Sequence, residues 1–106
     1  MEMTYPKIIF YDCETTGLNP YHDEIIELAA VDQNGNKYNE LFKPKKQSGI
    51  SEFIENLTKI TNKMVKNKPH FEDAYDSFLD FIGRDSNPVY LIAHNQDFDK
   101  MFLKKY

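Results

Sequence analysis

The stretch Ile8-Ile9-Phe10-Tyr11-Asp12-Cys13-Glu14-Thr15-Thr16-Gly17-Leu18 decides the fold of this chain. Its β-branched and aromatic residues predict a buried strand that ends in a polar turn at residues 15–17. Because side chains alternate along a strand, Asp12 and Glu14 are expected on the same face. Two neighbouring carboxylates repel each other, and a divalent metal ion with oxygen ligands would remove that repulsion. The alternative is a strand that ends in solvent with two acids of no function.

Length and composition predict one small globular domain. The chain has 106 residues, of which 41% are hydrophobic, with eight Phe and seven Tyr among them. A single cysteine allows no internal disulfide, which fits a reducing compartment. No apolar run approaches the roughly 18 residues of a membrane span. We therefore expect a soluble, cytoplasmic protein without membrane contact.

The charges of the chain are unevenly distributed. Eight lysines and three acids lie between Lys37 and Lys68, so this segment carries +5 although the whole chain carries −4. A basic segment beside an acidic site would suit a phosphate polymer held near metal ions. The alternative is a lysine-rich surface that is simply solvated.

Three further segments predict strands. Residues 25–31 and 37–42 flank the turn signal Asn34-Gly35, so they predict a hairpin that extends the first strand into an antiparallel meander. Residues 89–93 form a continuous apolar run, which is typical of a central strand covered on both faces.

Helices are predicted between the third and fourth strands and after the fourth. Within residues 49–68, Ser51 is a candidate cap for one short helix, and Thr58 or Thr61 for another. A longer helix that ends at Gly83 has an apolar stripe, which predicts core packing: Phe71, Ala74, Tyr75, Phe78, Leu79 and Ile82. The last helix begins at Asp97.

This order of elements predicts an α/β fold with a mixed sheet and flanking helices. A right-handed crossover places the fourth strand parallel to the first and beside it. Asp12 and Glu14 end the first strand, and Asp99 follows the fourth on the next helix. Because sites form at the carboxyl ends of adjacent parallel strands, we expect these three carboxylates to meet at one edge of the sheet.

Two motifs resemble those of a known family. The segment Asp12-Cys13-Glu14-Thr15-Thr16-Gly17-Leu18 resembles the first motif of the DnaQ-like (DEDDh-type) 3′–5′ exonucleases. The segment Ala93-His94-Asn95-Gln96-Asp97-Phe98-Asp99 resembles the second. The similarity extends over nearly the whole chain. It implies a ribonuclease H-like fold and hydrolysis of phosphodiester bonds at the single-stranded 3′ end of DNA or RNA, with two Mg²⁺ or Mn²⁺ ions as cofactors.

The resemblance also implies roles for individual residues. Asp12 would bridge the two ions, Glu14 would hold the ion on the side of the nucleophile, and Asp99 would hold the other. The backbone at Thr15 and Thr16 would contact the terminal nucleotide. The pocket around the last base would be formed by three further residues: Leu18, Asn95 and Phe98.

The family has a third motif, a histidine followed by an aspartate on a later helix, which no residue of this chain matches. His22, His70 and His94 are expected to be surface or turn residues. We therefore expect an exonuclease-like domain over residues 1–106 that is incomplete at its C-terminus. Its catalysis should be impaired, because a general base contributes roughly 10²–10⁴-fold.

An incomplete domain has a structural consequence and leaves other functions open. Phe102, Leu103 and Tyr106 would be exposed, and a second chain or a dimer would cover the edge of the sheet. One alternative function is a non-catalytic remnant that binds nucleic acid. Another is a protein-interaction domain that uses the open edge.

Overall fold

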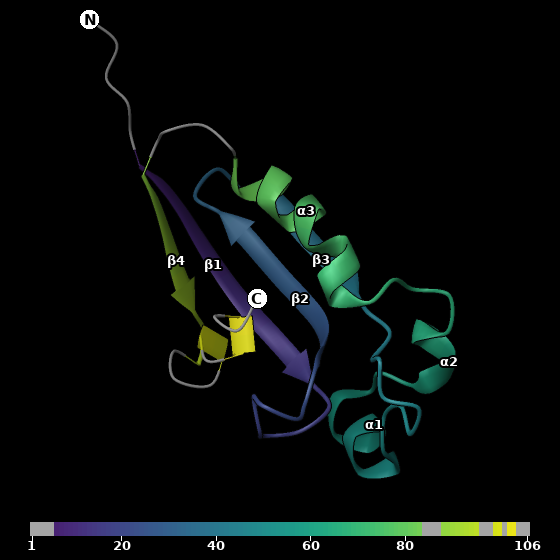
Figure 1. Cartoon of the computed structure of the whole chain (residues 1–106). Coiled ribbons are helices and arrows are strands. Elements are labelled where there is room, and N and C mark those ends of the chain that lie inside the picture. The colour runs from purple at the N-terminus through teal and green to yellow at the C-terminus, as the bar shows by residue number, and fades with distance from the viewer. Residues whose placement is uncertain (1–5, 84–87, 96–98, 101, 104–106) are drawn as a thin grey trace, which may run out of the picture.

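A computed structural model describes residues 6–83, 88–95, 99–100 and 102–103 of the chain, and its centre is a four-stranded sheet (Figure 1). The strands β1 (Lys7–Thr15), β2 (Ile25–Asp32) and β3 (Lys37–Leu41) form an antiparallel meander. Strand β4 (Val89–Ala93) pairs with β1 in parallel, which gives the order β3-β2-β1-β4. The predicted α/β mixed sheet is thereby confirmed.

The hairpin between β2 and β3 turns at the predicted Asn34-Gly35 signal. Asp32, at the end of β2, accepts hydrogen bonds at Oδ1 from the backbone amides of Asn34 (2.8 Å) and Asn36 (2.9 Å). Gly35 has a φ of 85°, a conformation that glycine adopts without steric cost.

Three helices connect β3 to β4: α1 (Glu52–Thr58), α2 (Asn62–Val65) and α3 (Phe71–Ile82). The hydroxyl of Ser51 caps α1, as predicted. Of the two candidates for the next cap, it is Thr61 whose hydroxyl accepts the backbone amide of Met64 at 3.2 Å. Within the described ranges, no helix is long and apolar enough to cross a membrane.

The helix α3 covers one face of the sheet over β2 and β3 (Figure 1). Its residues Phe71 and Phe78 are buried, and the remaining stripe residues pack around them, which confirms the predicted core face. The ring of Phe78 lies 5.4 Å from that of Tyr38 on β3, in an edge arrangement. Phe71 meets Phe42 in the same way at 5.0 Å.

The C-terminal residues pack against the same face of the sheet as α3. Residues 99–100 and 102–103 are helical, and Phe102 and Leu103 belong to the core cluster that contains Tyr11 and Phe78. Phe102 is 0% exposed and Leu103 8% exposed, so the prediction that they lie open to solvent is wrong. The chain turns back over the sheet after β4, and both side chains are covered. Tyr106 lies outside the described residues.

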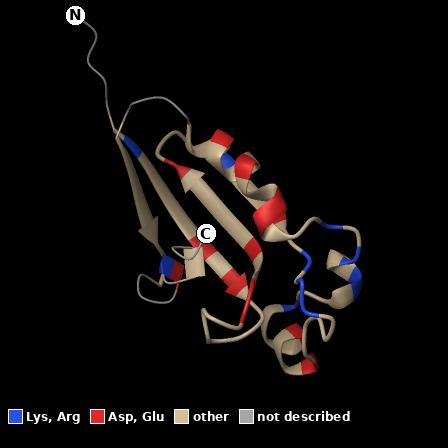
Figure 2. Ribbon diagram, in the orientation of Figure 1, with Lys and Arg blue, Asp and Glu red and all other residues tan. Residues whose placement is uncertain are grey.

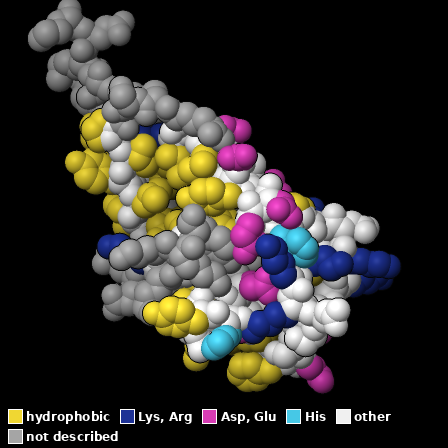
Figure 3. All heavy atoms as spheres, viewed as in Figure 1, with side chains coloured by type: hydrophobic (Ala, Val, Ile, Leu, Met, Phe, Trp, Pro, Cys, Tyr) yellow, Lys and Arg dark blue, Asp and Glu magenta, His cyan; other side chains and the backbone are white. Residues whose placement is uncertain are grey.

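Strand β4 is less covered than its apolar sequence predicts. Tyr90, Leu91 and Ile92 are 57%, 43% and 37% exposed. The prediction of a strand covered on both faces is therefore wrong for the described part of the chain. The reason is the position of β4 at the edge of the sheet, where only β1 pairs with it among the described residues. Figure 3 shows hydrophobic side chains at the surface along this side of the molecule.

Candidate active site

The carboxylates of β1 lie on the face opposite α3. Tyr11, Cys13 and Thr15 are buried, whereas Asp12 is exposed and Glu14 is half-buried between them. This alternation confirms that Asp12 and Glu14 share a face. Asp12 lines an open groove of about 420 Å³ on that face, together with apolar and polar residues of all four strands.

Asp99 follows β4 in the chain and lies at the same end of β1 as the two carboxylates. Its side chain is 1% exposed, and its Oδ2 accepts the backbone amide of Asn95 at 3.3 Å. The carboxyl of Asp99 also contacts the backbone of Cys13 and the carboxyl of Asp12. Burial, and then the neighbouring charge of Asp12, raise the pKa of Asp99. The fold thus brings together two carboxylates, of Asp12 and Asp99, that are 87 positions apart in the chain.

A fourth carboxylate, which sequence reasoning missed, lies beside them. Glu27 on β2 pairs directly with Glu14 on β1. Burial, and then the charge of Asp12, raise the pKa of both glutamates. Like charges placed opposite each other destabilise a sheet. The period of two in β2 was readable from sequence, but the register that puts Glu27 opposite Glu14 was not.

The donor chemistry of this cluster fits a divalent cation. Its side chains offer only carboxylate oxygens, the ligands that hard cations such as Mg²⁺ prefer. Burial first, and then the charge of Asp12, raise the pKa of Glu14 and of Asp99, and a bound cation would favour the charged form of both. Among the described residues, however, no group of three His, Cys, Asp or Glu side chains is already arranged to hold a metal ion. The carboxylate oxygens of the cluster are suitable ligands for a divalent cation, and their side chains would have to move to coordinate it.

The loop after β1 is closed by Asp23. Its carboxylate accepts the hydroxyl of Thr16 and the backbone amide of Asn19, both at 3.0 Å. Burial raises the pKa of Asp23, but these hydrogen bonds and the ammonium of Lys46 outweigh it, so the pKa is lowered overall. Asp23 therefore fixes the backbone that follows the two β1 carboxylates, a role that its position in a turn-rich segment did not predict.

Gly17 is required where this loop passes Asp23. A Cβ atom at position 17 would lie 2.5 Å from Oδ2 of Asp23. We expect Gly17→Ala to displace Asp23 and to lower the free energy of unfolding by about 1–3 kcal/mol, the usual cost of overpacking. Urea denaturation measures this. The control is Gly35→Ala, because no atom lies within 4 Å of a Cβ there and only backbone strain remains. Equal losses in the two variants would contradict the close-contact explanation.

The remaining residues predicted to bind substrate lie around this loop. Thr15 is buried and its hydroxyl donates to the carbonyl of Gly17 at 2.6 Å. Leu18 is 84% exposed on the loop. Asn95 touches Asp99 through its backbone amide. Phe98 lies outside the described residues.

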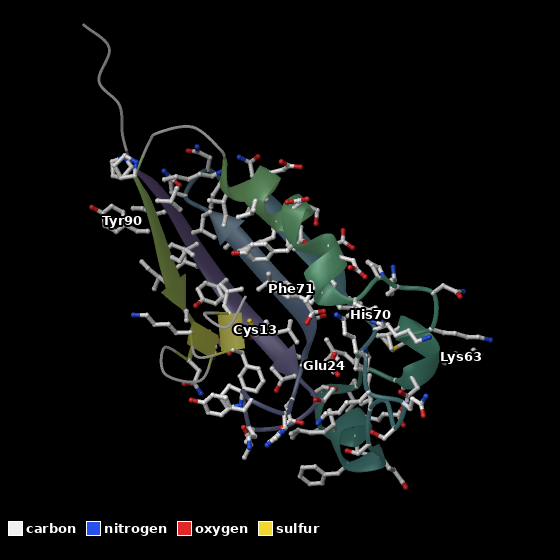
Figure 4. All side chains as sticks on the ribbon, viewed as in Figure 1. Cys13, Glu24, Lys63, His70, Phe71 and Tyr90 are labelled. Atoms are coloured by element: carbon white, nitrogen blue, oxygen red, sulfur yellow. The ribbon has the colours of Figure 1, made fainter. Side chains whose placement is uncertain are left out.

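Cysteine and histidine chemistry has little support at this site. Burial, followed by the charges of Asp99 and Asp12, raises the pKa of the Cys13 thiol, so it stays protonated and is a poor nucleophile. Figure 4 shows Cys13 in the interior, on the same side of the sheet as Phe71. Nδ1 of His70 is hydrogen-bonded to the carbonyl of Lys43 at 2.7 Å, as expected of a turn residue. His94 is exposed and lines the groove of Asp12.

The acidic cluster predicts a particular pH dependence of stability. Glu14, Glu27 and Asp99 have pKa values above those of the unfolded chain, so each favours the folded state only while protonated. Without metal, the free energy of unfolding should fall as pH rises above about 4, the unfolded value. Urea denaturation across this range should give a shallower decline for Glu27→Gln. A steeper decline in that variant would contradict the repulsion.

Sequence comparison decides the family. A family model described as Exonuclease (RNase_T) matches residues 9–106. The chain belongs to this exonuclease family. It is 39% identical over 100 residues to the PolC-type DNA polymerase III of Caldanaerobacter subterraneus subsp. tengcongensis, covering 92% of the chain and 7% of that protein. The PolC-type polymerase III of Thermotoga maritima is 40% identical over 100 residues, with 91% and 7% covered. The chain thus spans a small part of these relatives.

Solved structures agree with the DnaQ-like exonuclease fold, which is ribonuclease H-like. Exonuclease I of E. coli in complex with a dT13 oligonucleotide superposes with a TM-score of 0.75 at 18% identity, covering 92% of the chain and 22% of that chain. Exonuclease X in complex with 5′ overhanging duplex DNA gives a TM-score of 0.67 at 28% identity, with 90% and 52% covered. The predicted family and fold are both confirmed.

Proposed function

We propose that this chain binds the 3′ end of single-stranded DNA or RNA at Asp12, Glu14 and Asp99 and hydrolyses the terminal phosphodiester bond with Mg²⁺ or Mn²⁺. The observation that carries the proposal is the buried carboxyl of Asp99 in contact with Asp12, because the two residues come from different motifs. Uncompensated acids at this position have no structural benefit. The exonuclease family, and the similar structures of exonuclease X and exonuclease I in complex with DNA, support the choice of substrate.

Each part of the site would have a separate task. Asp12, Glu14 and Asp99 would hold the cations, which when bound would polarise the scissile phosphate and lower the pKa of an attacking water. The backbone amides near Thr15 and Thr16 would orient the terminal nucleotide, with Asp23 keeping that loop in place. Leu18, exposed at the loop, and Asn95, next to Asp99, would contact the last base. Phe98 follows in the same motif.

The rate of the proposed reaction would depend on a general base that takes the proton from the attacking water. His94 is the one histidine of the chain that lines the groove beside Asp12, within the described residues. A misplaced or absent base would lower the rate by about 10²–10⁴-fold.

The direct test is end-trimming of a labelled strand. Single-stranded DNA and RNA with a 5′ label would be incubated with the chain in Mn²⁺ or Mg²⁺ and compared with Asp12→Asn and His94→Ala. We expect trimming from the 3′ end that Asp12→Asn abolishes and that His94→Ala leaves unchanged. Trimming that survives Asp12→Asn would refute the assignment of the site. Loss of trimming in His94→Ala would make that histidine the base.

A second candidate function is association of two copies through β4. Tyr90, Leu91 and Ile92 are exposed on an edge strand, where unpaired backbone groups and apolar side chains favour contact with another chain. Light scattering after gel filtration tests this. We expect a concentration-dependent dimer that Leu91→Asp disrupts, and a monomer at all concentrations would exclude it.

A further inference from the structure

A basic region extends from Lys45 to Lys68, over the segment that contains α1 and α2. Its first two lysines, Lys45 and Lys46, each lie close to an acidic side chain. The Nζ of Lys45 lies 3.6 Å from Glu72, and the Nζ of Lys46 lies 3.6 Å from Asp23. These two lysines therefore contribute little free positive charge to the surface.

Positive charge without an acidic partner gathers farther along, at α1 and α2. Four exposed lysines there have no carboxylate within 4.0 Å among the described residues, and we call them the α2 lysine surface: Lys59, Lys63, Lys66 and Lys68. Figures 2 and 3 show this charge on the side of the molecule away from β4, where Figure 4 labels Lys63. Glu55 of α1 accepts a hydrogen bond from the backbone amide of Asn62 at 2.7 Å.

The backbone under these lysines is held firmly. A second apolar cluster ties α1 and α2 to the sheet: Ile26, Ile50, Ile54, Ile60 and Val65. The side chain of Asn62 accepts the amide of Ile50 and donates to its carbonyl, both at 2.8 Å. Because the backbone is already ordered, binding a ligand here would cost less conformational entropy than ordering a free loop.

One of the four lysines stands where glycine would be more stable. Lys59 is the C-cap of α1 and has a φ of 66°, the left-handed conformation that helix C-caps usually give to glycine. A side chain at such a position costs about 1 kcal/mol. An outlier of this kind, exposed and cationic, is a reason to look for a function of the charge.

The basic region is continuous with the loop after β1. The carboxylate of Glu24 accepts the backbone amides of Lys45 (2.7 Å) and Lys46 (3.1 Å), while Lys46 pairs with Asp23. Asp23 in turn holds Thr16, two positions beyond Glu14. The loop beside the acidic site is thus linked through hydrogen bonds and an ion pair to the segment that precedes α1.

We propose that the α2 lysine surface binds the phosphate backbone of the strand, several nucleotides on the 5′ side of the end held at the carboxylates. This rests on the proposed function, which supplies the position of the 3′ end. Lysines spread over an exposed surface match the repeated charges of a polymer better than a single small anion. The chain as a whole carries a net charge of −4, which would repel a phosphate chain. The α2 lysine surface is a local exception that would attract it.

The test measures binding and its salt dependence, with no need for turnover. The affinities of 5′-labelled oligonucleotides of 3 and 12 nucleotides would be measured by fluorescence anisotropy between about 50 and 200 mM NaCl. Each phosphate contact to a single strand contributes about 0.7 to the slope of log K against log salt. We expect Lys63→Gln with Lys66→Gln to reduce the slope for the 12-mer by about 1.4 and to leave the 3-mer unchanged.

Two variants separate a binding role from a structural one. Lys59→Gly should weaken binding of the 12-mer and reduce its slope by about 0.7 while the thermal midpoint stays equal or rises. Lys45→Gln removes the same charge, but that charge is already matched by Glu72, so this variant should leave the slope for the 12-mer unchanged. An unchanged slope in the α2 variants, or an equal effect of Lys45→Gln, would overturn the proposal.

The outcomes also distinguish this proposal from the proposed function. A lysine-dependent slope for the 12-mer without any trimming or metal effect would reject the exonuclease site and retain the lysine surface. Trimming that depends on Asp12 with no lysine effect would do the reverse. Binding to anionic vesicles but to neither oligonucleotide would overturn the proposal in favour of a membrane surface.

Discussion

Asp99→Asn is expected to remove the response of the domain to Mn²⁺ and to stabilise the metal-free protein. In the wild-type chain, Mn²⁺ at about 100 times its Kd should add about 2.7 kcal/mol to the free energy of unfolding. The variant should lose most of this, because a carboxylate ligand becomes a neutral amide. Without metal it should gain stability, since the buried carboxyl of Asp99 no longer faces the charge of Asp12. Thermal melts with and without Mn²⁺ measure both effects.

The variant should be more stable than the wild type without metal and should gain less stability from Mn²⁺. A misfolded variant would not give this combination. A damaged fold would lower the melting temperature in both conditions. Glu40→Gln, an exposed change on β3, is the matched control and should leave the Mn²⁺ shift intact. An undiminished Mn²⁺ shift in Asp99→Asn would show that the cation binds elsewhere.

Phe78→Ala is expected to cost about 3–5 kcal/mol, the range for a buried aromatic side chain. Phe78 is 1% exposed and contacts the ring of Tyr38, so its loss leaves a cavity between α3 and the sheet. Small domains have only about 5–15 kcal/mol of total stability. We therefore expect a clearly lower urea midpoint and a fraction of unfolded protein at 37 °C.

The control for this variant lies on another helix. Phe53→Ala on α1 removes the same side chain from a position that is 73% exposed, and it should change stability by less than about 0.5 kcal/mol. A similar loss in both variants would show that α3 is not the centre of the core.

The parts of the fold that follow from local pattern were predictable. The apolar stripe of α3 and the turn at Asn34-Gly35 fixed those elements, and the right-handed crossover rule placed β4 beside β1. The shared face of Asp12 and Glu14 followed from the period of a strand.

The wrong or missing predictions all depended on contacts between distant segments. An apolar run cannot tell a central strand from an edge strand, so Ile92 was expected to be covered. Phe102 was expected in solvent because an incomplete domain would lack part of the packing surface of the last helix, but Phe102 packs into the core beside Tyr11 and Phe78. Glu27 was missed because its position opposite Glu14 depends on strand register. Asp23 was missed because its carboxylate joins Thr16 and Asn19 of its own loop to Lys46 of a distant segment.

The measurement that tests the candidate site most directly is a titration of the metal-free chain with Mn²⁺, followed by the broadening of backbone amide resonances in NMR spectra. Paramagnetic broadening reports which residues lie near the bound ion. The site predicts that broadening begins at residues 12–14 and at Asp99, and that Asp12→Asn abolishes it. Broadening that begins at the exposed acids of α3, such as Glu72 and Asp73, would contradict the site.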